Sequence, residues 1–111
     1  MNHTVADWGH VIIWEFYARA GGEARFEEIY GPEGEWAQFF KSGAGYVGSE
    51  LNRDCKVPSR YVTLDFWTSR SAYREFREAN LARYEALDQR CEALTERETE
   101  LGSFDRILRH S

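Results

Sequence analysis

The sequence has 111 residues, 42% of them hydrophobic and 30% charged, with a net charge of -5. This length and composition are typical of one soluble globular domain. An acidic chain without a basic run is a poor partner for nucleic acids, and its longest apolar run, Val11–Trp14, is far below the ~20 residues that span a bilayer. We therefore expect neither a nucleic-acid partner nor a membrane segment.

The ends and the cysteines of the chain indicate where it works. Residues 1–9 are polar and predict a flexible leader, followed by a single domain over residues 10–108. The first ten residues lack the basic start and the apolar stretch of a signal peptide, so we expect a cytoplasmic location. Cys55 and Cys91 have no metal-ligand spacing, and we expect both thiols to be reduced.

The first predicted element is a strand over His10–Ala18, because this segment is dense in β-branched and aromatic residues. Its two alternating faces are both apolar apart from Glu15, which indicates that both faces are covered. The next elements, in chain order, are predicted as a helix over Glu23–Tyr30, a helical segment over Glu33–Ser42, and strands over Tyr46–Asp54 and Arg60–Trp67.

The last part of the chain predicts a long helix and a final strand. Thr68 or Ser69 can cap a helix that runs from Ser69 to about Leu94, since apolar residues recur there at steps of three and four. Thr95–Thr99 is predicted to be a polar connection, and Glu100–Leu108 to be the fourth strand.

This order of elements predicts an α+β domain of the ferredoxin-like βαββαβ kind, with a four-stranded antiparallel sheet and helices on one face. We expect the first and third strands to be central neighbours that run parallel to each other. The other sheet face then lacks cover and exposes an apolar patch. A two-fold homodimer would cover it. We place Ile12, Trp14 and Phe16 in this dimer interface, with Ile13 and Tyr17 as the alternative set.

Five segments of the chain carry a resemblance to a known family. They are VIIWEFYARAGG, FEEIYGPEGEWAQFF, GYVGSELNRD, YVTLDFWTSRSAYREF and ALDQRCEALTERETELGSF. In this order, and with a Trp that ends the third strand before a helix, the chain resembles the antibiotic biosynthesis monooxygenase (ABM) domain family over residues 10–108. The resemblance implies a dimeric α/β barrel.

The resemblance also implies an activity. Members of the family include cofactor-independent monooxygenases that oxidise polyphenolic or anthrone-type molecules with O₂. Relatives that degrade haem use an Asn on the first strand, the Trp at the end of the third strand and a His on the second helix. Here the first position is Glu15, the Trp is Trp67, and the second helix holds no His. Haem degradation is therefore not expected.

Two carboxylates are candidate proton-transfer groups. If the first and third strands are neighbours, Glu15 and Asp65 can point into one layer about 4.8 Å apart. One of two such carboxyls in an apolar setting has a raised pKa and can accept a proton from a phenol or an enol. The alternative is that each pairs with an arginine such as Arg53, Arg60 or Arg77.

Other polar and aromatic side chains complete the predicted site. Asn80 interrupts an apolar helix face, so it either orients the substrate or marks a helix surface or bend. The residues predicted to bind a flat ligand, which are equally consistent with plain core, are Trp36, Phe40, Tyr61, Thr63, Trp67 and Tyr84.

Two functions remain open from the sequence. The first is an ABM-like monooxygenase without cofactor or metal that acts on a small aromatic or quinone-like molecule, with Glu15, Asp65 and Asn80 as catalytic residues. The second is a non-catalytic dimeric barrel that binds a small molecule or has a structural role. The volume of the pocket separates them, because a cavity filled by Trp36 and its neighbours favours the second.

Overall fold

The computed structural model describes residues 7–108. Its elements in chain order are β1 (His10–Ala18), α1 (Glu23–Tyr30), α2 (Glu35–Phe40), β2 (Tyr46–Arg53), β3 (Arg60–Trp67), α3 (Arg70–Ala79), α4 (Leu81–Cys91), the short 3-10 helix η2 (Glu92–Leu94) and β4 (Thr95–Asp105). The predicted ferredoxin-like α+β fold is confirmed, with β1, α1 and β3 at their predicted bounds.

The four strands form one sheet in the order β2-β3-β1-β4, and every neighbouring pair is antiparallel. The expectation that the first and third strands run parallel is therefore wrong. The hairpin between β2 and β3 makes these two antiparallel, and the crossover through α1 and α2 brings β2 back in the direction of β1. β3 thus lies between two strands that run opposite to it.

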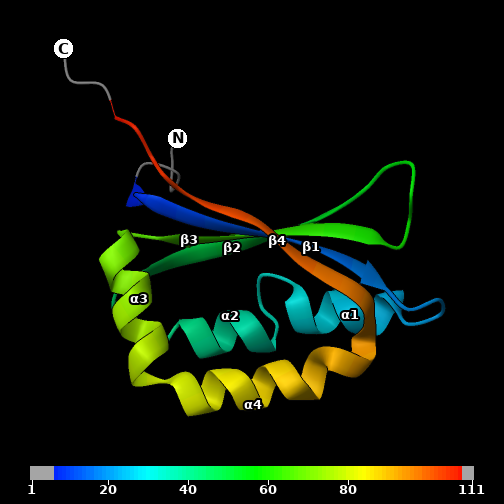
Figure 1. Cartoon of the computed structure of the whole chain (residues 1–111). Helices are drawn as coiled ribbons and strands as arrows, with labels where there is room; N and C mark the ends of the chain where they lie inside the picture. The colour runs from blue at the N-terminus through cyan, green and yellow to red at the C-terminus, as the bar shows by residue number, and fades with distance from the viewer. Residues whose placement is uncertain (1–6, 109–111) are drawn as a thin grey trace.

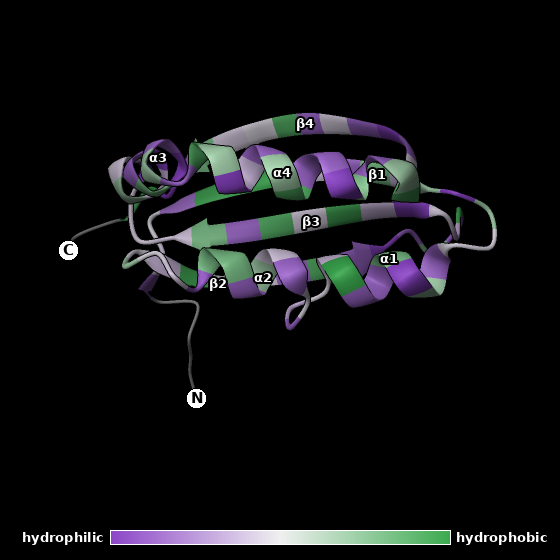
Figure 2. Cartoon of the chain, turned by 90° about the horizontal axis from the view of Figure 1, so that it is seen from below, coloured by the Kyte–Doolittle hydropathy of each residue, from purple (hydrophilic) through white to green (hydrophobic). Residues whose placement is uncertain are grey.

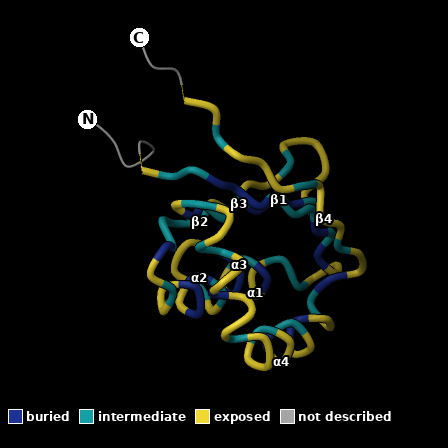
Figure 3. Tube along the Cα trace, turned by 60° about the vertical axis from the view of Figure 1, so that its left-hand side comes forward, coloured by how far each residue is buried: buried dark blue, intermediate teal, exposed yellow. Residues whose placement is uncertain are grey.

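All helices cover one face of this sheet, as Figure 1 shows. Seen from the helix side, α1 and α2 follow each other in one row, and α4 lies beside them in a second row (Figure 2). Between the helices and the sheet lies a core of aromatic and aliphatic side chains. Phe26, Tyr61 and Trp67 are its largest fully buried members. In Figure 3 the outer side of α4 is exposed and the start of β1 is buried.

The predicted long helix is divided into α3 and α4 at Asn80. Asn80 leaves helical geometry, with φ -123° and ψ 26°, and its side-chain Nδ2 donates to the Phe76 carbonyl at 2.9 Å. An asparagine side chain that competes for a helical carbonyl favours such a bend. The alternative reading of Asn80, as the site of a helix bend, is therefore the one confirmed.

The last strand begins earlier than predicted. Residues 95–99 belong to β4 and pair with β1. The segment is polar because β4 is an edge strand with largely exposed side chains, so its composition resembles that of a loop.

The beginning of the described chain is ordered by the sheet. The first six residues of the predicted leader lie outside the described residues, but Trp8 packs edge-on against Phe66 with ring centroids 5.1 Å apart. The backbone N–H of Gly9 also donates to the Trp67 carbonyl at 2.9 Å.

The dimer-interface residues were assigned to the wrong face. Ile12 and Phe16 are 5% exposed and belong to the core beneath the helices, and Trp14 packs against the same core. The face without helices instead carries Ile13 and Tyr17, the two residues of the alternative set. We call it the open face. Its apolar side chains on the central strands are Val11, Ile13, Tyr17, Val62, Leu64 and Phe66.

Candidate functional site

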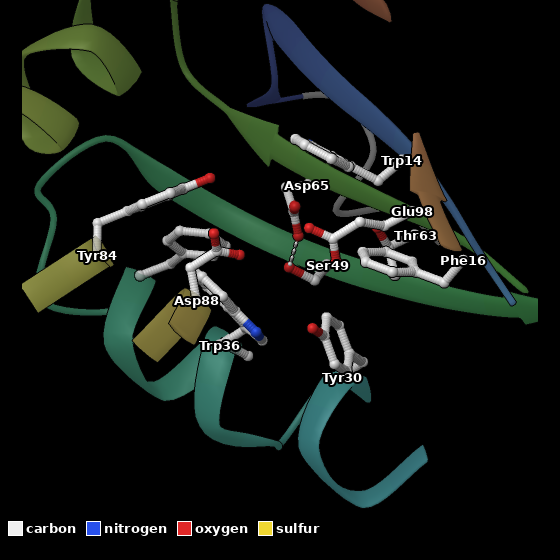
Figure 4. Close-up of a pocket in the computed structure, with 12 residues that line it drawn as sticks. Trp14, Phe16, Tyr30, Trp36, Ser49, Thr63, Asp65, Tyr84, Asp88 and Glu98 are labelled. Carbon is white, nitrogen blue, oxygen red and sulfur yellow. Dashed lines mark hydrogen bonds between the residues drawn. The ribbon is translucent and has the colours of Figure 1, made fainter. Parts of the chain in front are cut away.

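A cavity lies between the helix-covered face of the sheet, α1, α2 and α4 (Figure 4). Its volume is about 40 Å³, which is room for a few water molecules. Aromatic rings and carboxyl groups form most of its wall. The lining residues are Trp14, Phe16, Tyr30, Trp36, Ala37, Phe40, Ser49, Thr63, Asp65, Tyr84, Asp88 and Glu98.

Asp65 is the central polar group of this cavity. Its Oδ1 accepts a hydrogen bond of 2.6 Å from the Ser49 hydroxyl, and the hydroxyls of Tyr46 and Ser49 are 2.6 Å apart. Because Ser49 gives its hydrogen to Asp65, the Tyr46 hydroxyl donates to Ser49. The chain Tyr46–Ser49–Asp65 therefore orients the carboxyl group through one of its oxygens.

Burial raises the pKa of Asp65 from 3.8 to about 6, and the hydrogen bond from Ser49 opposes this shift. Among the described residues, no cationic side chain pairs with Asp65. A carboxyl group with this pKa is ionised at neutral pH and is a stronger base than an ordinary aspartate. It can accept a proton from a bound phenol or enol.

A β-bulge makes this hydrogen-bond chain possible. Tyr46 and Ser49 are three residues apart, and in a regular strand they would point to opposite faces. The pairing of β2 with β3 shifts between Tyr46 and Gly48, so that Tyr46 lies opposite Trp67 and Ser49 lies opposite Asp65. The bulge thus turns both hydroxyls towards the helices.

Glu15 is not in the cavity. Antiparallel pairing sets Glu15 opposite Val62 and Asp65 opposite Ile12. Paired residues share a face, and Ile12 is three residues from Glu15, so the two carboxylates lie on opposite sides of the sheet. The Arg60 Nε donates to Glu15 at 2.7 Å. For Glu15 the arginine-paired alternative is confirmed, and the expectation that it points into one layer with Asp65 is wrong.

Asn80, Tyr61 and Trp67 are also absent from the cavity wall. Asn80 lies at the junction of α3 and α4. The Tyr61 hydroxyl donates to Glu27 at 2.6 Å, so it has a structural partner. Trp67 is fully buried among core rings, with Phe76 at 5.2 Å between centroids.

The other predicted binding residues do line the cavity: Trp36, Phe40, Thr63 and Tyr84. Trp36 meets Tyr84 edge-on at 5.2 Å between ring centroids. The Trp36 Nε1 is buried and has no hydrogen-bond partner among the described residues. Because this atom is buried, the indole ring has to move before its N–H can donate to a bound molecule.

Sequence reasoning missed several lining residues. Asp88 follows Tyr84 by four residues, and this helical spacing indicates that both lie on one face. Glu98 was not predicted because its segment was expected to be a connection between elements. Ser49 was not predicted because the bulge has no clear sequence signal. Trp14 and Phe16 were assigned to the opposite face.

The part of the chain that the structure describes shows no group of three His, Cys, Asp or Glu side chains arranged to hold a metal ion. In the same residues, no helix has both the length and the apolar character needed to cross a bilayer.

Comparison with solved structures gives close matches of fold. SnoaB from Streptomyces nogalater, a cofactor-independent oxygenase whose mutant form was solved, is 25% identical with a TM-score of 0.69, over 94% of this chain and 97% of that one. The chain has the fold of the antibiotic biosynthesis monooxygenase family. The resemblance found in the sequence is confirmed.

Two provisionally named ABM proteins show the same fold at lower identity. The one from Bordetella bronchiseptica is 23% identical, with a TM-score of 0.63 over 90% of this chain and 99% of that one. The one from Deinococcus radiodurans is 14% identical, with a TM-score of 0.69 over 92% of this chain and 96% of that one. The sequence itself matches no family model and no curated protein.

Proposed function

We propose that this ABM-fold protein is a monooxygenase that needs no cofactor and oxidises a small aromatic or quinone-like molecule. The observation that carries the proposal is Asp65, a carboxyl group with a pKa of about 6 in an aromatic-lined cavity. Its similarity to SnoaB, which is named a cofactor-independent oxygenase, supports the same reaction class.

The proposed chemistry begins with proton transfer. Asp65 accepts the proton of a phenolic or enolic hydroxyl, and the resulting anion is electron-rich enough to react with O₂. At the oxidised carbon a C–H bond breaks and a C=O bond to one oxygen atom forms, while the other oxygen atom takes up two hydrogens of the substrate and leaves as water. The substrate supplies all the electrons, so no external reductant is consumed. The unpaired Trp36 Nε1 would donate to the negatively charged oxygen and stabilise it.

The size of the cavity sets a condition on this proposal. A cavity that holds one benzene ring has a volume on the order of 150 Å³, whereas this one has about 40 Å³. A ring can therefore bind only if a lining side chain moves. Trp14, Trp36 and Tyr84 are half-buried, so their rings can rotate at a lower packing cost than the fully buried Phe40.

The same small volume favours the second candidate, a non-catalytic binding protein. Trp36 packs against Phe40 and Tyr84, with ring centroids 5.7 and 5.2 Å apart, and the space left beside these rings is about 40 Å³. In that case the cavity would bind a small ligand without turnover. Asp65 would then serve only in recognition.

We further propose that a second copy of the chain covers the open face. Within residues 7–108, no helix lies on that side of the sheet (Figure 1). Its central part carries Ile13 and Leu64, both only partly covered, and Phe104 at its edge is 52% exposed. Apolar side chains gathered on one uncovered sheet face are typical of a two-fold interface.

Oxygen uptake tests the catalytic proposal. The wild-type protein should consume O₂ with at least one member of a panel of phenols, quinols and anthrones. Asp65→Asn keeps the shape of the side chain but cannot accept the proton, so it should lower the rate about 100-fold or more. The control is Glu15→Gln, on the opposite face, which should retain the wild-type rate.

Two results would contradict the proposal. Uptake that is equal in wild-type and Asp65→Asn protein would remove Asp65 from the reaction. Saturable binding of panel members without any oxygen uptake would establish the non-catalytic alternative.

A further inference from the structure

Two carboxyl groups in the cavity have no part in the proposed chemistry. Asp88 projects from α4 and Glu98 from β4, and Figure 4 shows both directed into the same space as Asp65. Both side chains are half-buried. Neither has a hydrogen bond or an ion pair within the described residues.

The surroundings of these two carboxyl groups differ from those of ordinary surface carboxylates. Glu15 pairs with Arg60 and Glu35 with Arg90, whereas unpaired carboxylates such as Glu50 and Glu75 are exposed to solvent. No Lys, Arg or His is among the residues that line the cavity. Within residues 7–108, three carboxyl groups therefore face one partly enclosed space, no cationic side chain lines it, and Arg77 acts on Asp88 only from outside. Such an arrangement is costly unless a bound group of opposite charge compensates it.

The electrostatics of the pair agree with this geometry. Burial raises the pKa of Glu98 most, and the charges of Asp88 and Glu92 raise it further. Burial also raises the pKa of Asp88, with a further rise from Glu92 and an opposing influence of Arg77. Arg77 lies outside the cavity, where its guanidinium carbon is 4.7 Å from the centre of the Tyr84 ring.

The rest of the wall is suited to an organic cation. Trp14, Phe16, Trp36 and Tyr30 present π systems, whose faces attract an ammonium group. An aromatic wall offers few ligands to a metal ion. An ammonium group is about as large as one water molecule, and one water needs on the order of 10–15 Å³ of such space, so it fits the volume of about 40 Å³.

From these observations we infer that the substrate is a cationic aromatic amine, whose protonated amino group binds between Asp88 and Glu98 among the aromatic rings. This inference rests on the proposed function and adds the charge of its substrate. Neutral analogues bind more weakly than the amine. Anionic analogues are repelled by the three carboxylates.

Binding of three matched phenols tests the inference. Tyramine, para-ethylphenol and para-hydroxyphenylacetate share one ring and differ mainly in charge. Titration calorimetry without oxygen measures their affinities in the absence of turnover. We expect tyramine to bind about tenfold more tightly than para-ethylphenol, and para-hydroxyphenylacetate to bind most weakly.

Variants connect that preference to the two carboxyl groups. Asp88→Asn and Glu98→Gln should each lower the affinity for tyramine about fivefold and leave the affinity for para-ethylphenol unchanged. The matched controls are Glu85→Gln on α4 and Glu96→Gln on β4, both exposed and outside the cavity wall, which should leave all affinities unchanged.

The inference is wrong if tyramine does not bind, if it binds no better than para-ethylphenol, or if both cavity variants keep the wild-type preference. Failure of the proposed function looks different. A charge preference that depends on Asp88 and Glu98, without oxygen uptake on any panel member, would retain the amine site and remove the catalysis. Oxygen uptake with neutral phenols, combined with no binding preference for tyramine, would retain the catalysis and remove the amine site.

Discussion

The two sides of the sheet hold carboxylates with opposite surroundings. On the open face, Glu15 is paired with Arg60 at 2.7 Å, and Arg60 also pairs with Asp54 at 2.9 Å. On the helix-covered face, Asp65 accepts one hydrogen bond from a described residue, the Ser49 hydroxyl, and burial raises its pKa to about 6. Residues of the same chemical class on neighbouring strands thus have different roles. The strand register decides which face, and therefore which partner, each one has.

The largest expected effect concerns the open face. Leu64→Asp places a charge at the centre of the proposed dimer interface, where an unpaired carboxylate is costly to bury. At micromolar concentration the wild-type protein should sediment with twice the mass of its 13.0 kDa chain. The variant should sediment as a monomer.

The matched control is Val57→Asp, which changes a residue 41% exposed in the loop between β2 and β3. It should remain a dimer. A wild-type monomer, or a Leu64→Asp protein that remains a dimer, would show that a second copy does not cover this face.

The next effect concerns the stability contribution of Asp65. The folded protein holds the Asp65 proton more tightly than the unfolded chain, because burial raises the pKa from 3.8 to about 6. The free energy of unfolding should therefore fall as pH rises through this window and stay constant above it, a loss of about 3 kcal/mol. The Asp65→Asn variant has no carboxyl group to ionise at this position, so its free energy of unfolding should not show this fall.

Urea unfolding at about pH 4 and about pH 7 measures the difference. The stability of Asp65→Asn relative to the wild-type protein should increase by about 2 kcal/mol between the two conditions, since part of the total change already lies below pH 4. A relative stability that does not change with pH would mean that the Asp65 carboxyl group has an ordinary pKa.

The smallest expected effect is on the open face. Glu15→Gln removes a partly buried ion pair and should lower the free energy of unfolding by about 1–2 kcal/mol. Glu28→Gln, which removes a pair with Arg25 in which both side chains are more than 60% exposed, should cost less than about 0.5 kcal/mol. Equal costs for the two variants in urea unfolding would mean that burial adds nothing to the Glu15–Arg60 pair.

The sequence predicted the fold better than it predicted the site. Strand composition and glycine or proline breaks located β1, α1 and β3, because those signals are local. The bend at Asn80 and the polar edge strand β4 were missed, since each resembles another structure in composition.

The site depends on register, which composition does not encode. A single antiparallel pairing separates Glu15 from Asp65, and a single bulge brings Tyr46 and Ser49 to one face. Trp36, Phe40, Thr63 and Tyr84 were found because residues of these types near the predicted helix–sheet contact tend to line its cavities.

The central claim is that Asp65 accepts the substrate proton. The pH dependence of kcat/KM for oxygen uptake tests it most directly, measured with two phenols of different acidity. The account predicts that kcat/KM rises with pH to a plateau, with a midpoint near the Asp65 pKa of about 6 for both phenols. A midpoint that follows the acidity of the phenol instead, together with an unchanged rate in Asp65→Asn protein, would contradict it.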